Sequence, residues 1–147
     1  MILKLMTVSE TALHMDRIRE SLTLAFTAFP RPGLVARMIE EVEHGRLGVF
    51  GAMEGDKLLA VLIVRIIESS LTQERVFYLA SLAGFEDLPE GAFDVIAGEV
   101  DRMARESKCD VIEADIGNPN LAKITVRYGY SMMSVKVRKE ILHGTVR

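Results

Sequence analysis

The stretch LGVFGAMEGDKLLAVLIVRIIES, residues 47–69, decides which fold the rest of the chain can adopt. It holds two β-rich runs separated by Gly55 and Asp56. This pattern predicts an antiparallel hairpin whose turn needs a residue that tolerates positive φ. The second run, residues 57–69, is apolar on both of its faces. Such a strand belongs in the middle of a sheet that is covered on both sides.

The residues after the hairpin predict a strand, a helix and a further strand. ERVFYLASLAGF (74–85) has strand character, apolar residues recur at helical spacing over 92–107, and CDVIEADI (109–116) again has strand character. Because the order is strand, helix, strand, we expect a parallel pair joined by a right-handed crossover. NPNLAKITVRYGY predicts a short helix with Asn118 as its N-cap and Gly129 at its end, and residues 131–142 predict a last strand.

The residues before the hairpin predict one short strand and two helices. ILKLMTV (2–8) has strand character, and Ser9 and Glu10 suit a helix start. Apolar spacing continues this helix to Phe29, PRPG (30–33) stops it, and a second helix runs from Leu34 to an end at Gly45. The whole chain therefore predicts a single α/β domain over residues 1–147, with a mixed sheet of about six strands and helices on both faces.

Composition excludes several classes of protein. The formal charge is −3 and no basic run occurs, so binding to a nucleic acid backbone is not expected. The longest apolar run, LLAVLIV (58–64), is far shorter than the roughly 20 residues of a membrane helix, and residues 1–10 lack the pattern of a signal peptide, so we expect an intracellular protein without a membrane partner. A single cysteine, Cys109, and three histidines give no metal cluster, and Cys109 is expected to pack at a strand start.

From residue 74 onward the chain resembles the GNAT family, the acetyl-CoA-dependent N-acyltransferases. The element order matches over the whole chain, and Asn118 and the pair Gly129-Tyr130 match the start and end of the family's last helix. The helix ending ARESKC, followed by an Ile-Glu strand, is also similar to GNAT-related proteins of tailed bacteriophages. The resemblance implies a GNAT fold, acetyl-CoA as cofactor, and a phage particle as one location of the protein.

The loop before the long helix departs from the family. In family members a Gln/Arg-x-x-Gly-x-Gly/Ala pattern surrounds the coenzyme A pyrophosphate with main-chain N–H groups. Here the loop is GFEDLPEGAFDV (84–95), which carries Glu86, Asp87, Glu90 and Asp94, and the first basic residue after it is Arg102. A helix start attracts anions through its unpaired N–H groups, but carboxylates there repel a pyrophosphate. The position suits a phosphate loop and the charge does not.

A second departure concerns the acid that protonates the departing thiolate. Family members often have a tyrosine four residues before the final Gly-aromatic pair, and this chain has Thr125. A hydroxyl that does not titrate in the useful range is a poor general acid compared with a phenol. Tyr128 lies about 300° around the helix from this position at 100° per residue, so it is no substitute.

Four acidic residues are further candidates for chemistry. Glu68 and Glu74 flank a turn where family members can place the base that deprotonates an amine, although turns are ordinarily polar. Glu113 and Asp115 should project from one face of their strand. They could act as a base or bind a cation, or they could be solvated charges paired with Lys or Arg.

Two main hypotheses follow for function. The first is a degenerate GNAT-fold protein, without a cofactor, that serves as an interaction or structural module and binds a protein partner or a second copy. The second is an active N-acyltransferase in which acetyl-CoA is held by main-chain hydrogen bonds around Leu82, Ala83 and Gly84, with Asn118 nearby. A third is regulation by a small ligand in the same cleft. The first two differ in whether coenzyme A binds.

Overall fold

A computed structural model describes residues 1–25, 33–84, 87–116, 119–133, 139 and 141–143. The chain divides into two compact units, Met1–Gly117 and Asn118–Arg147. The first unit contains the sheet. The expectation of one domain over residues 1–147 stays a prediction.

The first unit is a mixed sheet with helices on both faces. Its elements are β1 (Ile2–Leu5), α1 (Val8–Leu13), α2 (Met15–Ala25), α3 (Leu34–Glu43), β2 (Gly48–Glu54), β3 (Lys57–Glu68), β4 (Arg75–Gly84), α4 (Ala92–Glu106) and β5 (Val111–Ala114). The strand order is β1-β2-β3-β4-β5, with β4 and β5 parallel and the other neighbours antiparallel. The predicted fold class is confirmed, with five strands among the described residues where about six were expected.

The hairpin of β2 and β3 forms as predicted. Glu54 pairs with Lys57 across a turn in which Gly55 has a φ of +60°. This left-handed conformation is one that glycine adopts without a steric cost. β3 lies in the centre of the sheet, and every residue from Leu58 to Val64 is buried. Burial on both faces explains why this strand has no alternating polar positions.

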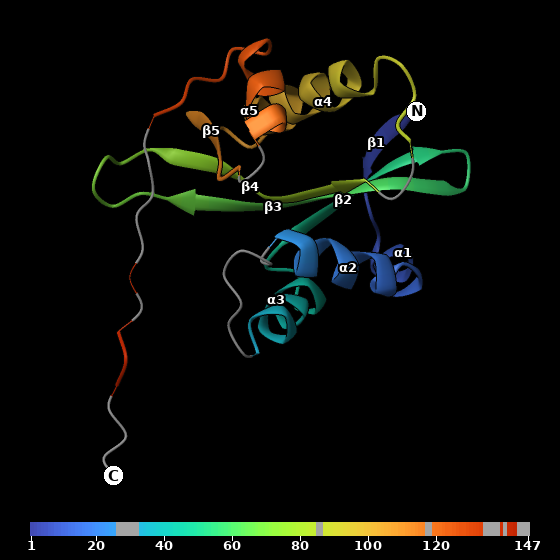
Figure 1. Ribbon diagram of the computed structural model, residues 1–147, viewed down its shortest axis with the longest axis horizontal. Coiled ribbons are helices and arrows are strands. Elements are labelled where there is room, and N and C mark those ends of the chain that lie inside the picture. The colour runs from blue at the N-terminus through green and yellow to red at the C-terminus, as the bar shows by residue number, and fades with distance from the viewer. Residues whose placement is uncertain (26–32, 85–86, 117–118, 134–138, 140, 144–147) are drawn as a thin grey trace. The chain divides into compact units, whose positions relative to one another are not determined.

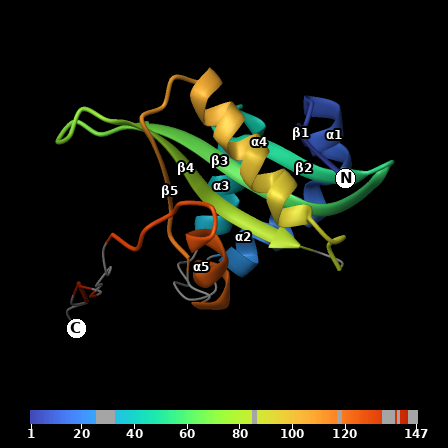
Figure 2. The ribbon, with the colours of Figure 1, turned by 90° about the horizontal axis from the view of Figure 1, so that it is seen from above.

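Helices cover the two faces of this sheet differently. Three helices, α1, α2 and α3, lie on one face and α4 lies on the other (Figures 1 and 2). Ile18 and Leu22 of α2 are fully buried in the first core, and Ile96 and Val100 of α4 are buried in the second. The helical spacing of these apolar residues is what the sequence pattern indicated.

The N-terminal elements differ from the prediction. β1 ends at Leu5, and the helix expected from Ser9 begins at Val8, with Thr7 as its N-cap. The Thr7 hydroxyl accepts from the Glu10 N–H and the Glu10 carboxylate accepts from the Thr7 N–H, both at 3.1 Å, which is a capping box. His14 separates α1 from α2, where one helix was expected. The expected continuation through Phe26 and Phe29 lies outside the described residues.

The region after α2 keeps the predicted helix and its end. Residues 30–32 of PRPG lie outside the described residues, and α3 begins directly after Gly33. The helix ends at Glu43, followed by His44 and by Gly45 with a φ of +70°. This is the expected end at a glycine that adopts a left-handed conformation.

The second unit contains α5 (Pro119–Val126). After it the chain turns at Gly129, whose φ is +90°. The expected N-cap Asn118 lies outside the described residues, as do residues 134–138 and 140 of the expected last strand. The described part of residues 131–142 is not in a strand. Among all described helices, none combines the length and apolar character that a bilayer crossing requires.

Candidate functional site

β4 and β5 separate at a defined point. Their parallel pairing runs from Val76–Val111 to Leu79–Ala114 and then stops, while β4 continues to Gly84 beside β3. On the β3 side the register places Val64 opposite Leu79 and Ile63 opposite Ser81, so Ala80 is an extra residue, a β-bulge. A bulge bends its strand and interrupts the ladder. The end of β4 therefore runs past β5, and along residues 80–84 it has a described partner on one side only.

A buried pair of hydroxyls fixes the bulged part of β4. Ser81 and Ser21 of α2 are both buried, and their Oγ atoms lie 2.8 Å apart. The Ser81 hydroxyl also lies within 3.4 Å of the Ser21 carbonyl oxygen. Buried hydroxyls are costly unless they are hydrogen-bonded. This mutual satisfaction holds the strand against α2 directly after the bulge.

Beside the point of separation, Tyr78 joins the two strands through its side chain. Its hydroxyl donates to Asp115 Oδ2 at 2.6 Å, and in the ladder Tyr78 lies opposite Glu113. Burial, and then the hydrogen bond to Asp115, raise the pKa of Tyr78 far above its usual range. Tyr78 therefore stays protonated and donates. The sequence alone assigned it no role, although the parallel pairing of β4 with β5 could have indicated its position opposite Glu113.

The start of α4 has no capping side chain, and acidic side chains lie on either side of it in the sequence. Gly91, with a φ of +79°, is the N-cap and offers no side chain to the first N–H groups. The Ala92 N–H donates to the Pro89 carbonyl at 3.1 Å. The described acidic residues of this loop are all exposed: Asp87, Glu90 and Asp94. The main chain fits an anion, whereas the side chains create a negative potential that opposes one.

The predicted site residues fall into separate places. Leu82, Ala83 and Gly84 lie on β4 after the bulge, close in sequence to the start of α4. Glu68 and Glu74 lie at the opposite end of β4, about 30 Å away at a rise of about 3.3 Å per residue.

Glu68 is held at that opposite end. Its carboxylate accepts from Arg75 Nη1 at 2.8 Å, and Arg75 Nε donates to the Ser107 carbonyl at 2.9 Å. The structure therefore does not bring Glu68 or Glu74 together with residues 82–84.

The remaining candidates lie in the second unit or outside the described residues. Thr125 donates its hydroxyl to the Ala122 carbonyl within α5 at 2.7 Å. Asn118 lies outside the described residues. Cys109 is half-buried after α4, and no group of three or more potential metal ligands occurs in the part of the chain that the structure describes.

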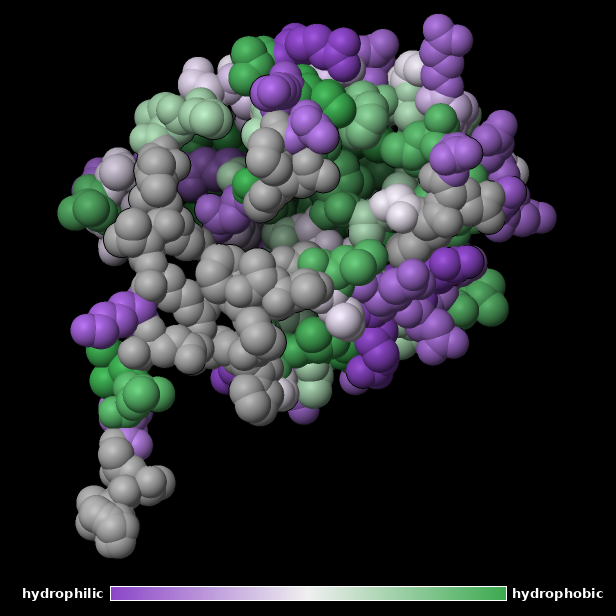
Figure 3. All heavy atoms as spheres, viewed as in Figure 1, coloured by the Kyte–Doolittle hydropathy of each residue, from purple (hydrophilic) through white to green (hydrophobic). Residues whose placement is uncertain are grey.

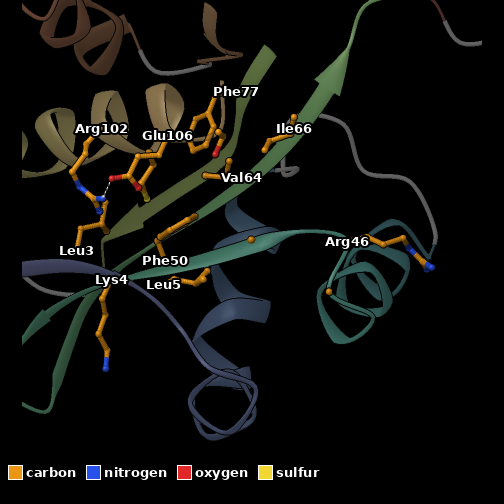
Figure 4. Close-up of a pocket in the computed structure, with 14 residues that line it drawn as sticks. Leu3, Lys4, Leu5, Arg46, Phe50, Val64, Ile66, Phe77, Arg102 and Glu106 are labelled. Atoms are coloured by element: carbon orange, nitrogen blue, oxygen red, sulfur yellow. Dashed lines mark hydrogen bonds and ion pairs between the residues drawn. The ribbon is translucent and has the colours of Figure 1, made fainter. Parts of the chain in front are cut away.

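A hollow of about 620 Å³ lies elsewhere on the first unit. Its floor is apolar, with Leu3, Phe50 and Phe77, and its rim includes Arg102 at the end of α4 (Figure 4). Since α4 is about 21 Å long at 1.5 Å per residue, the hollow is far from the start of α4 at Gly91. It is not the cleft beside residues 82–84.

Arg102, the first basic residue after the acidic loop, has its own carboxylate partners. Its guanidinium lies 2.7 Å from Glu99 and 2.7 Å from Glu106. These hydrogen bonds raise the pKa of Arg102 and lower the pKa of Glu99. The cation is thus engaged along its own helix and does not offset the charge of the loop.

Comparison with known proteins gives a fold. No family model matches the sequence, and no curated protein matches it. A mutant of the BH1408 protein of Bacillus halodurans has 18% identity and a TM-score of 0.69, covering 97% of this chain and 100% of that chain. A predicted acetyltransferase of Clostridium acetobutylicum, solved with acetyl-CoA, has 13% identity and a TM-score of 0.69, covering 94% of each chain.

A further similar structure is an aminoglycoside N-acetyltransferase in complex with CoA, with 16% identity and a TM-score of 0.67. It covers 95% of this chain and 93% of that chain. At these identities the likeness shows the fold, which is the GNAT acetyltransferase fold.

Proposed function

We propose that this chain is a GNAT-fold protein that has lost coenzyme A chemistry and acts as an interaction module. The single observation that carries the proposal is the pair of exposed carboxylates directly before α4, Asp87 and Glu90, followed by the exposed Asp94 in its first turn. A coenzyme A pyrophosphate at this helix start would lie among them.

The electrostatic cost of placing a pyrophosphate at this helix start can be estimated. Two like charges 4 Å apart repel by about 1 kcal/mol in water and by more near a protein surface. The screening length is about 8 Å at physiological salt, so salt removes only part of the repulsion between charges that are closer than this. The helix dipole contributes roughly 0.3–1 kcal/mol per favourable charge, which does not offset several carboxylates.

The chemistry of the other candidates supports the same function. Thr125 uses its hydroxyl proton within α5. Glu68 pairs with Arg75 at the end of β4 opposite to Gly84. Tyr78 is a phenol with a raised pKa, so at neutral pH it is neither a base nor a ready proton donor to a thiolate.

Calorimetric titration with coenzyme A and with pantetheine, which lacks the phosphates, tests the proposal. We expect coenzyme A to bind no more tightly than pantetheine, and any affinity to increase with salt, because salt screens repulsion. Micromolar binding of coenzyme A that weakens with salt, together with acetyl transfer from acetyl-CoA to an amine, would contradict the proposal. Asp87→Asn with Glu90→Gln should increase the affinity for coenzyme A.

A second candidate function is N-acyl transfer from acetyl-CoA, and one observation favours it. The separation of β4 from β5 after the Ala80 bulge leaves main chain along Leu82 to Gly84 that could pair with a pantetheine arm. Mass spectrometry of a panel of amines incubated with acetyl-CoA tests it, and an acetylated amine that depends on the protein would establish it. The phage association rests on sequence resemblance alone and stays a prediction.

A further inference from the structure

The first thirteen residues present apolar side chains to the surface. Four large apolar side chains of β1 and α1 are exposed: Ile2 (60%), Leu5 (61%), Val8 (89%) and Leu13 (78%). No residue of α1 is buried. In the view coloured by hydropathy, an apolar group stands at the surface over α1 beside charged ones (Figure 3). Ile2 and Leu5 project from opposite faces of β1, so exposed apolar side chains lie on both sides of this strand.

β1 is also an edge strand with free main-chain groups. It pairs with β2 on one side, and among the described residues no strand pairs with its other side. The Met6 N–H donates to the Val49 carbonyl at 2.8 Å. Because pairing alternates along an antiparallel strand, the main-chain groups of Leu3 and Leu5 point away from β2. These groups are a template for another strand.

The charged side chain that could protect this edge is already paired. Lysines on edge strands discourage pairing with other chains. Lys4 is the only charged residue of β1, and its ammonium group pairs with the Glu10 carboxylate. The capping box of α1 fixes Glu10 in reach of Lys4, so the neutralisation is built into the turn between β1 and α1.

We propose that a second copy of this chain pairs with β1 through this edge, antiparallel and about a two-fold axis at Lys4. In this register Leu3 of one copy lies opposite Leu5 of the other, so the outward main-chain groups of both residues are satisfied. Leu3, Lys4 and Leu5 border the apolar hollow, and Leu3 and Leu5 share one face of the strand (Figure 4). Leu5 of the second copy is thereby brought over apolar surface.

A second copy is the occupant that fits because the pairing is self-complementary. Two-fold interfaces use the same patch on both partners, and the neutralised Lys4–Glu10 pairs at the axis do not repel each other strongly. Pairing of four-residue strands buries less than the roughly 800 Å² per partner of a standard interface. We therefore expect a reversible dimer whose population depends on concentration. The inference does not depend on whether coenzyme A binds.

Sedimentation velocity over a range of concentrations tests the dimer. We expect the wild-type protein to shift from monomer to dimer as concentration rises, and Leu5→Lys to weaken the dimer at least tenfold. Leu71→Lys is the matched control. Leu71 is 92% exposed in the β3–β4 turn, so this substitution adds the same charge away from β1. A wild-type protein that stays monomeric at every concentration overturns the proposal, as does equal dimerisation of wild type and Leu5→Lys.

Cross-linking tests the register even if Leu5→Lys folds poorly. In a Cys109→Ser background, Lys4→Cys places two thiols at the axis, where directly opposite residues that share no hydrogen bonds have Cα atoms about 4.5 Å apart. This spacing permits a disulfide. Mild oxidation should give a covalent dimer of this variant and not of Ser70→Cys in the β3–β4 turn. Equal cross-linking of the two variants overturns the proposed register.

Discussion

The starts of α1 and α4 use acidic residues in opposite ways. At α1 the Glu10 carboxylate accepts from the Thr7 N–H and forms an ion pair with Lys4, so its negative charge is paired next to the helix start. At α4 the N-cap is Gly91, which has no side chain, and Asp87 and Glu90 are exposed. The first helix start is closed by its own side chains, whereas the second leaves its main chain open and surrounds it with charge.

This difference shows that acidic residues near a helix start do not by themselves say what the start can bind. An acid that caps the helix stabilises it and removes a binding position. Acids that stay in solvent leave the N–H groups available and decide which ligands can approach them. Changes of charge at α4 and of the caps at both helix starts should therefore have different effects.

Charge reversal should open the start of α4 to polyanions. With Asp87→Lys and Glu90→Lys, two repulsive charges become attractive, and at roughly 0.3–1 kcal/mol per charge the gain is about 1–4 kcal/mol. We expect the affinity for inorganic pyrophosphate, measured by calorimetry, to rise about tenfold or more. The control is Glu54→Lys with Asp56→Lys in the β2–β3 turn, which changes net charge equally. An equal gain in the control would show that only net charge matters.

Replacing the N-cap glycine should destabilise the protein. Gly91 has a φ of +79°, and a Cβ there meets no atom within 4 Å, so the cost of Gly91→Ala is the backbone conformation, about 1–2 kcal/mol. Urea unfolding measures this. Gly98→Ala in the interior of α4 is the matched control, and it should stabilise by up to about 1 kcal/mol because alanine favours a helix. Equal effects of the two substitutions would contradict the role of Gly91.

Loss of the capping box should destabilise α1. Thr7→Ala removes the hydroxyl that accepts from the Glu10 N–H, and such substitutions cost about 1 kcal/mol. Ser9→Ala, inside the helix, is the control and should have a smaller effect. Urea unfolding of both variants distinguishes the observed N-cap from the one that the sequence suggested, since a larger loss for Ser9→Ala would contradict Thr7 as the cap.

The charge of Glu10 should make a small pH-dependent contribution. The hydrogen bonds from Lys4 and Thr7 lower the pKa of Glu10 from 4.5 to about 2. A lowered folded pKa means that the stabilisation is present above pH 4.5 and is lost as the pH falls towards 2. The difference in Tm between wild type and Glu10→Gln should therefore shrink over this range. A Tm difference between the two proteins that stays constant from pH 7 to pH 2 would contradict the stabilising role of the Glu10 charge.

Much of the fold could be predicted because the decisive signals are local. The glycine turn between β2 and β3 involves residues that are adjacent in the sequence, and the helical spacing of apolar residues lies within α4. The break at His14 could not be predicted, because the apolar spacing continues through it. The N-cap at Thr7 did have a signal, since Glu10 follows it by three residues in the capping-box spacing, and Ser9 has no such partner.

The candidate site was harder to predict because it depends on register. The end of β4 at residues 82–84 follows from strand length, but the Ala80 bulge and the Tyr78–Asp115 bond follow from which residues of β3 and β5 lie opposite β4. The separation of Glu68 and Glu74 from residues 82–84 could be predicted, because the expected strand 74–85 already places them at its two ends.

The Ala80 bulge also determines how this protein should respond to the deletion of one residue. Leu79 and Leu82 pack against one core, whereas Ala80 and Ser81 lie towards the other, so two successive residues share a face at the bulge. Removing Ala80 would leave Leu79 opposite Val64 and Ser81 opposite Ile63 in a regular ladder, with the other side chains on their present faces. Deleting Leu82 instead would exchange the faces of the residues on one side of it, so the strand should tolerate the loss of Ala80 better than the loss of its neighbour.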